Sequence, residues 1–223
     1  MRRLAAVYGG SAPHHRALNE PKYARWLADC IYLPELPNAD LTEYDGVIVP
    51  ERLHAGRLHA ARPRLLEMLE RAGTVVLFGE QPVCARQPRG WLPGLDWEYR
   101  PTNYWWWLEP GATSGLRAQH PEHDLWRHLT LKDATWHQHG VYRAPPGADV
   151  LISTDDGGAI LYIDRVSTPG TLLVAALDPM YHFGSYFMPA TERFLDKFMP
   201  WLAEGEIRGS SDAPQETHGA QHG

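Results

Sequence analysis

Short apolar runs alternate with amphipathic stretches along the first third of the chain. Four mostly apolar runs have the length of buried strands, and each ends at a turn-forming residue. They are Leu4–Tyr8, Asp29–Leu33, Tyr44–Val49 and Thr74–Phe78. Because parallel strands covered on both faces are apolar along most of their length, this pattern predicts a central, mostly parallel sheet.

The segments between these apolar runs have the periodicity of helices. Asn19–Ala28 and residues 55–72 carry apolar side chains at three- and four-residue spacing, as helices packed on a sheet do. Pro63 cannot donate a hydrogen bond inside a helix, so it predicts a break between a short helix and a longer one. The alternation of strands and helices predicts an α/β fold, a flavodoxin-like three-layer sandwich with helices on both faces of the sheet.

A long interruption precedes the last strands. Residues 83–148 are rich in Pro, Gly and Trp, which predicts an insertion of loops and short strands over the edge or the ligand end of the sheet. Asp149–Ser153 and Ala159–Asp164 are expected to form a hairpin, since an Asp-Asp-Gly-Gly turn separates them. Leu172–Leu177 is the last predicted strand and Pro189–Ala203 the closing helix.

The 223 residues suffice for one substantial core but not for two full domains. We expect a single domain over residues 1–205. The segment 206–223 is almost free of apolar residues, which predicts a disordered tail.

Composition excludes several classes of protein. No run reaches the roughly 18 apolar residues of a membrane span, and the net charge of −6 disfavours nucleic acid as a partner. Two cysteines, Cys30 and Cys84, do not indicate a disulfide framework. The apolar run after Met1-Arg2-Arg3 is too short for a signal peptide, so we expect a cytoplasmic protein.

Three segments together resemble a known family. Asp40–Pro50, Leu66–Phe78 and Leu172–Leu202 resemble, in order and spacing, the class I glutamine amidotransferase-like domains. The ThuA-like branch and the related middle domain of some β-galactosidases are the most similar members. The resemblance covers residues 1–82 and 170–203. It implies a ligand site at the carboxyl ends of the strands and surfaces used for dimers or for docking on a partner enzyme.

The family's nucleophile is missing. Where the family has a cysteine in a tight elbow after the fourth strand, this chain has Gly79-Glu80-Gln81, and Cys84 lies beyond the elbow. The family's His-Pro-Glu after the last strand is replaced by a segment that ends in His182. Because glutamine hydrolysis requires a thiolate to form the acyl-enzyme, we expect no glutaminase activity.

Polar residues at the strand ends are the candidates for ligand binding, because ligands of such sheets bind there. Arg52 has the donor geometry to grip a carboxylate or phosphate. We expect Gly184 to permit a close approach, and His14-His15 to lie in a mobile loop at the same rim. The ligand-binding candidates are Gly9, Gly10, Glu51, Arg52, His54, Gln81, His139, Asp178 and Tyr181.

Glu80, His137 and His182 are the candidates for acid–base catalysis. His137 and His139 would face the same side of an extended segment, as half of a metal site that His182, Glu80 or Asp178 could complete. The alternatives are structural. Glu80 could hold its turn through backbone N–H groups, the histidines could be hydrogen-bonded or exposed, and Asp178 could cap a helix. No cofactor is identified.

Tyr104–Trp107 could stack on a sugar, but a lid or an interface with a second copy or a partner protein is favoured. Three functions stay open at this point. The first is a binding module for a small polar ligand such as a carbohydrate. The second is a hydrolase or proton-transfer enzyme that uses Glu80 with His137, His139 or His182, with or without a metal. The third is a structural subunit of a complex.

Overall fold

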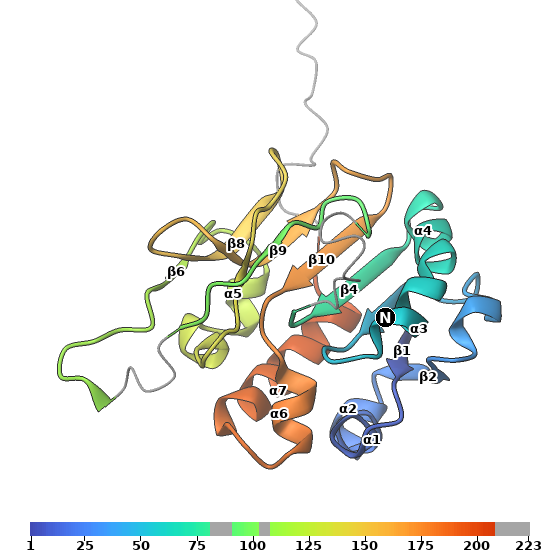
Figure 1. Cartoon of the computed structure of the whole chain (residues 1–223), viewed down its shortest axis with the longest axis horizontal. Helices are drawn as coiled ribbons and strands as arrows, with labels where there is room; N and C mark the ends of the chain where they lie inside the picture. The colour runs from blue at the N-terminus through green and yellow to red at the C-terminus, as the bar shows by residue number, and fades with distance from the viewer. Residues whose placement is uncertain (81–90, 103–107, 208–223) are drawn as a thin grey trace, which may run out of the picture.

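The computed structural model describes residues 1–80, 91–102 and 108–207. Within these residues, ten strands form one curled sheet in the order β2-β1-β3-β4-β10-β9-β7-β5, with β6 and β8 alongside (Figure 1). The parallel strands are β1 (Leu4–Tyr8), β2 (Leu27–Tyr32), β3 (Gly46–Val49), β4 (Thr74–Phe78) and β10 (Thr171–Ala175). The others are β5 (Trp97–Glu98), β6 (Leu116–Ala118), β7 (Val141–Tyr142), β8 (Asp149–Thr154) and β9 (Ala159–Asp164).

The parallel half of the sheet confirms the prediction from the apolar runs. β3, β4 and β10 are buried at every position, whereas β2 forms an exposed edge. The chain reverses after β10, and β9 pairs with it antiparallel. β8 and β9 form the predicted hairpin.

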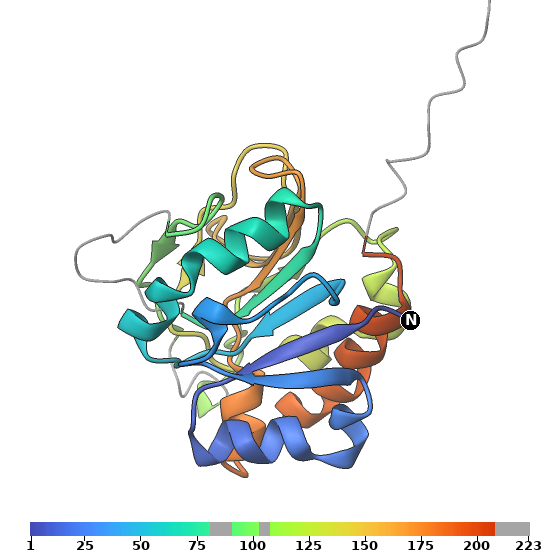
Figure 2. The same cartoon turned by 90° about the vertical axis from the view of Figure 1, so that its right-hand side faces the viewer.

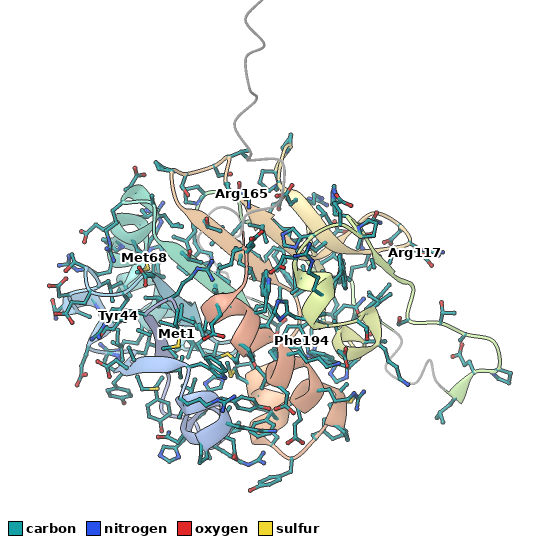
Figure 3. The ribbon with its side chains drawn as sticks, turned by 180° about the vertical axis from the view of Figure 1, so that it is seen from behind. Met1, Tyr44, Met68, Arg117, Arg165 and Phe194 are labelled. Atoms are coloured by element: carbon teal, nitrogen blue, oxygen red, sulfur yellow. The ribbon has the colours of Figure 1, made fainter. Side chains whose placement is uncertain are left out.

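Helices cover both faces of the sheet, so the protein has the predicted α/β sandwich fold (Figure 2). α3 (Ala55–Ala60) and α4 (Arg62–Glu70) lie on one face. On the other face lie α1 (Ala12–Asn19), α2 (Pro21–Ala24), α6 (Pro179–Gly184) and α7 (Pro189–Glu204). Met68 of α4 and Phe194 of α7 are fully buried on opposite sides of the sheet (Figure 3).

Three further short helical turns lie among the described residues. They are α5 (Leu125–His128) and the 3-10 turns η1 (Leu36–Asn38) and η3 (Leu131–Ala134). No helix of the described residues has the length and apolar character needed to cross a membrane.

The helices between β1 and β2 differ from the prediction. The expected helix over Asn19–Ala28 is wrong, because α1 ends at Asn19 and Pro21 starts the separate turn α2. The side chain of Ser11 caps α1 by accepting a hydrogen bond from the N–H of His14, so the helix begins earlier than its apolar residues suggest. The predicted break near Pro63 is confirmed, since α3 ends at Ala60 and α4 begins at Arg62.

Two of the helices approach very closely. A Cβ atom at Gly184 of α6 would lie 1.9 Å from the carbonyl oxygen of Pro13 in α1. Only glycine fits this contact, which confirms the expected close approach and fixes α6 against α1.

Candidate functional site

Three parallel strands lead to candidate residues at the same edge of the sheet. β3 leads directly to Glu51 and Arg52, β4 leads to Gly79, and β10 leads to Asp178 at the start of α6. The carboxyl ends of parallel strands meet at one edge, which is where such sheets bind ligands. We call this edge the carboxyl-end rim.

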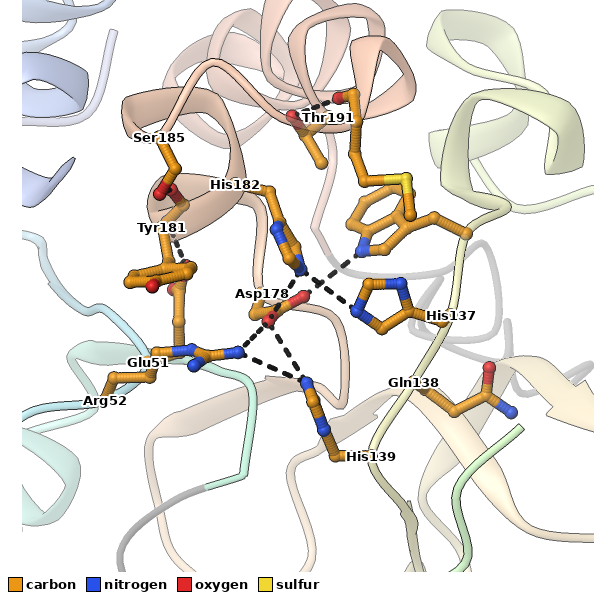
Figure 4. Close-up of polar contacts among 12 residues, drawn as sticks. Glu51, Arg52, His137, Gln138, His139, Asp178, Tyr181, His182, Ser185 and Thr191 are labelled. Carbon is orange, nitrogen blue, oxygen red and sulfur yellow. Dashed lines mark hydrogen bonds and ion pairs between the residues drawn. The ribbon is translucent and has the colours of Figure 1, made fainter. Parts of the chain in front are cut away.

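Asp178 is the centre of the polar contacts at the carboxyl-end rim (Figure 4). Its Oδ2 atom lies 3.0 Å from a terminal nitrogen of Arg52 and 3.1 Å from Nε2 of His182. Nε2 of His139 lies 3.5 Å from the same oxygen. The indole N–H of Trp136 donates to Oδ1 at 3.2 Å. Asp178 stands at the N-cap position of α6, but its side chain caps no helix N–H and faces these groups instead.

Three imidazoles gather around this carboxylate. Nε2 of His182 lies 3.2 Å from Nε2 of His137, and the rings of His137 and His139 lie 5.4 Å apart. His182 comes from α6, while the other two come from the segment between η3 and β7. The structure therefore brings His182 together with a pair of histidines from a segment that lies 45 positions earlier in the chain, as measured from His137.

Burial and charge shift the pKa values of the two central groups in the same direction. Burial would raise the pKa of Asp178, but hydrogen bonds from His139, His182 and Arg52 hold it well below its usual range. Burial lowers the pKa of His137 to about 4, although the charge of Asp178 acts the other way. At neutral pH the cluster thus holds an ionised carboxylate beside a neutral imidazole.

Glu51 lies completely buried below the carboxyl-end rim. Burial, with the negative charge of Asp178, raises its pKa to about 8, and the backbone N–H of Tyr181 donates to its Oε1 atom. Gly79 packs directly on Glu51, because a Cβ at this glycine would lie 2.4 Å from the Cβ of Glu51. The side chain of Glu51 therefore occupies the space that a side chain at position 79 would need.

Arg52 has a backbone conformation that side-chain-bearing residues rarely adopt, with φ of 57°. Its guanidinium lies 4.0 Å from the centre of the Tyr181 ring, and its side chain is 35% exposed. Such backbone strain persists where the surroundings fix it and is concentrated at functional sites. Arg52 therefore contacts the buried carboxylate of Asp178 and is also exposed at the surface of the rim.

His14 lies at the rim too, but not in the loop that the sequence suggested. It is buried in α1, and burial together with the charge of Arg52 lowers its pKa to about 4. The structure corrects the expectation of a mobile His14-His15 loop, since the Ser11 cap starts the helix before His14.

Three other candidates for ligand binding, Gly9, Gly10 and His54, have local structural roles. Gly9 permits the contact with Leu53, because a Cβ there would lie 2.5 Å from that side chain, and Gly10 has φ of 87°. His54 is exposed and caps α3 by accepting from the N–H of Arg57.

Glu80 is half-buried after Gly79, and among the described residues it takes no part in the contacts around Asp178. Gln81, Cys84 and Tyr104–Trp107 lie outside the described residues.

A cavity of about 920 Å³ lies at the opposite end of the sheet. It is lined by Met1, Arg71, Thr171 and Glu206, among other described residues, and by none of the clustered histidines. It brings no group of three metal-ligating side chains together, whereas the carboxyl-end rim does. The chemistry of the described residues therefore favours the rim over this cavity as the candidate site.

No protein-family model matches the chain, and no curated protein sequence does. Solved structures do. A putative ThuA-like protein from Parabacteroides merdae matches with a TM-score of 0.54 at 14% identity, over 96% of this chain and 93% of that one. One from Bacteroides uniformis matches with a TM-score of 0.52 at 14% identity, over 93% and 94%. A β-galactosidase from Rahnella sp. R3 matches with a TM-score of 0.53 at 15% identity, over 96% of this chain and 32% of that one.

These structural similarities show the fold of the chain. The chain has the fold of the ThuA-like proteins, as the resemblance implied. At this identity the comparisons carry no information on activity or ligand, so the function must be argued from the site.

Sequence reasoning named most of the clustered residues but missed two relationships. The burial of His14 against the rim was missed, although Ser11 followed by Pro13 is a recognisable helix start. The indole of Trp136 as a partner of Asp178 left no signal, because the two residues are 42 positions apart.

Proposed function

We propose that the chain binds a small polar ligand, a carbohydrate or a sugar acid, at the carboxyl-end rim and does not hydrolyse glutamine. The observation that carries the proposal is the placement of Arg52. Its guanidinium is fixed between the ring of Tyr181 and the carboxylate of Asp178, and its side chain is still partly exposed.

The contacts of Arg52 support a role in recognition. It uses one terminal nitrogen for both Asp178 and His139, at 3.0 and 3.3 Å. Among the described residues, its other two guanidinium nitrogens have no hydrogen-bond partner, so they can donate to a carboxylate or to sugar hydroxyls. The neighbouring Tyr181 offers an aromatic ring for the apolar face of a sugar.

The position of the one described cysteine supports the absence of glutaminase activity. Cys30 belongs to β2, the edge strand, and pairs with Ala6 of β1. β3 and β1 separate β2 from β4, so this thiol is roughly 14 Å from the elbow position, at about 4.8 Å per strand. The elbow itself carries Gly79 and Glu80.

One further observation supports a carbohydrate as the ligand. The β-galactosidase from Rahnella sp. R3 contains the same fold, and its name states action on a galactoside. The rim of this chain has polar donors, an aromatic ring and a carboxylate, which are the groups that sugar sites use. A carbohydrate is therefore the first class to test.

The test is a binding assay with neutral sugars and sugar acids. Galactose, glucose, galacturonate and glucuronate are titrated into the wild-type protein, Arg52→Ala and the control Arg57→Ala, an exposed arginine of α3. We expect binding in the wild type and the control, and at least tenfold weaker binding in Arg52→Ala. Equal binding by Arg52→Ala contradicts the proposal, and so does ammonia release from glutamine by the wild type.

A second candidate function is proton transfer or hydrolysis on such a ligand. The observation that favours it is His182, whose Nε2 lies between Asp178 and His137 at 3.1 and 3.2 Å. An imidazole oriented by a carboxylate is a usual general base. Glu51, whose pKa is raised to about 8, is a proton donor available near neutral pH.

This candidate is tested with nitrophenyl glycosides and esters. Activity in the wild type that falls at least a hundredfold in His182→Gln, and is kept in the exposed His15→Gln, supports it. Glu80→Gln tests the contribution first expected from that residue. Activity that survives in His182→Gln rules the mechanism out.

Docking through the Trp-rich insertion stays part of the proposal. Tyr104–Trp107, which would form the contact, lie outside the described residues. Light scattering on the wild type and on Trp106→Ala measures whether the chain associates with itself through this segment.

A further inference from the structure

Three atoms with lone pairs converge at the centre of the carboxyl-end rim. His137 and His182 approach through their Nε2 atoms at 3.2 Å, and Nε2 of His182 lies 3.1 Å from Oδ2 of Asp178. One donor atom from each of the three residues lies within 4.8 Å of the other two. All three side chains are buried.

Two of these three separations are close to the spacing of ligands around one small ion, and the third is at most 4.8 Å. Zinc binds imidazole nitrogen and carboxylate oxygen at about 2.0–2.2 Å, usually with tetrahedral geometry. Two ligands on such an ion are therefore about 3.3–3.5 Å apart. The two measured separations, 3.2 and 3.1 Å, are close to that value before any adjustment of the side chains.

Hydrogen bonds alone cannot pair all of the nitrogen and oxygen atoms that meet here. Nε2 of His182 carries one hydrogen at most, so it can make one full hydrogen bond, to Asp178 or to His137. If it instead accepts a hydrogen from His137, its lone pair faces the ionised carboxylate of Asp178. The other nitrogen of His182, Nδ1, is buried without a hydrogen-bond partner among the described residues. A cation is attracted by all three lone pairs at once.

We infer that His137, Asp178 and His182 bind one divalent transition-metal ion of the zinc type. Two imidazoles and one carboxylate are a ligand set that leaves a fourth position for water or a ligand. The inference deepens the proposed function and rests on it for the ligand that would reach this fourth position from Arg52 and Tyr181.

The surroundings of the three ligands suit such an ion. Trp136 donates to Oδ1 of Asp178, which leaves Oδ2 directed at the histidines. Arg52 and His139 approach Oδ2 from another side, at 3.0 and 3.5 Å. Such outer partners orient the ligands of metal sites and typically change metal affinity 10- to 100-fold. His139 is accordingly a positioning residue in this assignment.

The test is titration of the untagged, chelator-treated full chain with Co²⁺ alone, followed by visible absorption and elemental analysis. We expect one Co²⁺ per chain with the intense bands of a four-coordinate ion. Asp178→Asn and His182→Gln are expected to weaken binding at least tenfold, whereas the control His15→Ala, exposed on α1, keeps it. Circular dichroism on each variant establishes that it is folded.

Three outcomes overturn the inference. They are no Co²⁺ binding by the wild type, binding unchanged in folded Asp178→Asn and His182→Gln, and binding lost in His15→Ala. Arg52→Ala separates the two proposals, because it loses the sugar ligand but, as an outer partner of Asp178, only weakens Co²⁺ binding and keeps one Co²⁺ per chain at saturation if both are correct. Sugar binding by a wild-type protein that takes up no Co²⁺ overturns the metal site and leaves the proposed function standing.

Discussion

Asp178 and His182 lie one helical turn apart at the start of α6, with Oδ2 of the first 3.1 Å from Nε2 of the second. The backbone of one short helix therefore sets the geometry of this pair. Trp136, His137 and His139 reach the pair from the inserted segment, and Arg52 reaches it from the end of β3. The candidate site exists only when all three segments are folded together.

Removal of the Asp178 carboxylate should destabilise the protein strongly. Asp178→Ala leaves Arg52 and the buried imidazoles without their shared acceptor, and breaking a buried ion pair in this way costs about 3–5 kcal/mol. Urea unfolding in the presence of a chelator measures the free energy without any contribution from metal. Glu43→Ala, which removes an exposed ion pair with Arg3, is the control and should cost at most about 1 kcal/mol. Equal losses in the two variants contradict the account of the cluster.

Glu51 should make the protein less stable as the pH rises. Its folded pKa of about 8 exceeds the ordinary value of 4.5, so the folded state holds the extra proton between these values. The stabilising contribution is complete below about pH 4.5 and is lost as the pH rises through 8. Glu51→Gln should therefore be more stable than the wild type at pH 8.5, by roughly 2–4 kcal/mol, and similar at pH 4.5. A difference that does not change with pH refutes a buried neutral carboxyl.

His14 should give the opposite dependence. Its folded pKa of about 4 is below the ordinary value of 6.5, so the unfolded state binds the extra proton between these values. Stability is complete above about pH 6.5 and falls as the pH decreases toward 4. His14→Gln should flatten this part of the curve, as seen in thermal melts from pH 4 to 7. His15→Gln, at the neighbouring exposed position of α1, is the matched control for the substitution.

Gly79→Ala tests the packing of Glu51 in the elbow turn. Gly79 and Gly157 both have positive φ, 69° and 88°, but only Gly79 has an atom within 2.4 Å of the added Cβ. Gly157→Ala, with nothing within 4 Å, should cost about 1 kcal/mol from backbone strain alone. Gly79→Ala should cost at least about 2 kcal/mol more, because the backbone around Glu51 must move. Similar costs in both variants would mean that the turn adapts freely.

The sequence predicted the parallel half of the fold well, for a physical reason. β3, β4 and β10 are buried on both faces, so their apolar runs are continuous and easily recognised. β5 and β7 have two residues each and leave no periodic pattern. α1 escaped prediction because it has few apolar residues and depends on the Ser11 cap.

The candidate site, like the fold, could be predicted from the sequence only in part. The strand-end rule located Glu51, Arg52 and Asp178, because their neighbours in the sheet are fixed by topology. The rule favoured Glu80 over Glu51 as the acidic group, since the sequence holds no sign that Gly79 packs on Glu51. The approach of His137 to His182 joins segments 45 residues apart, and only the folded chain reveals it.

The most direct measurement of the central claim is an NMR titration of the labelled protein with galacturonate. If the carboxyl-end rim is the ligand site, the changed amide signals belong to Glu51–Leu53, Trp136–Gly140 and Asp178–Ser185, and they do not change in Arg52→Ala. Changes confined to Met1, Arg71 and Glu206, around the cavity at the opposite end of the sheet, would contradict the assignment of the site.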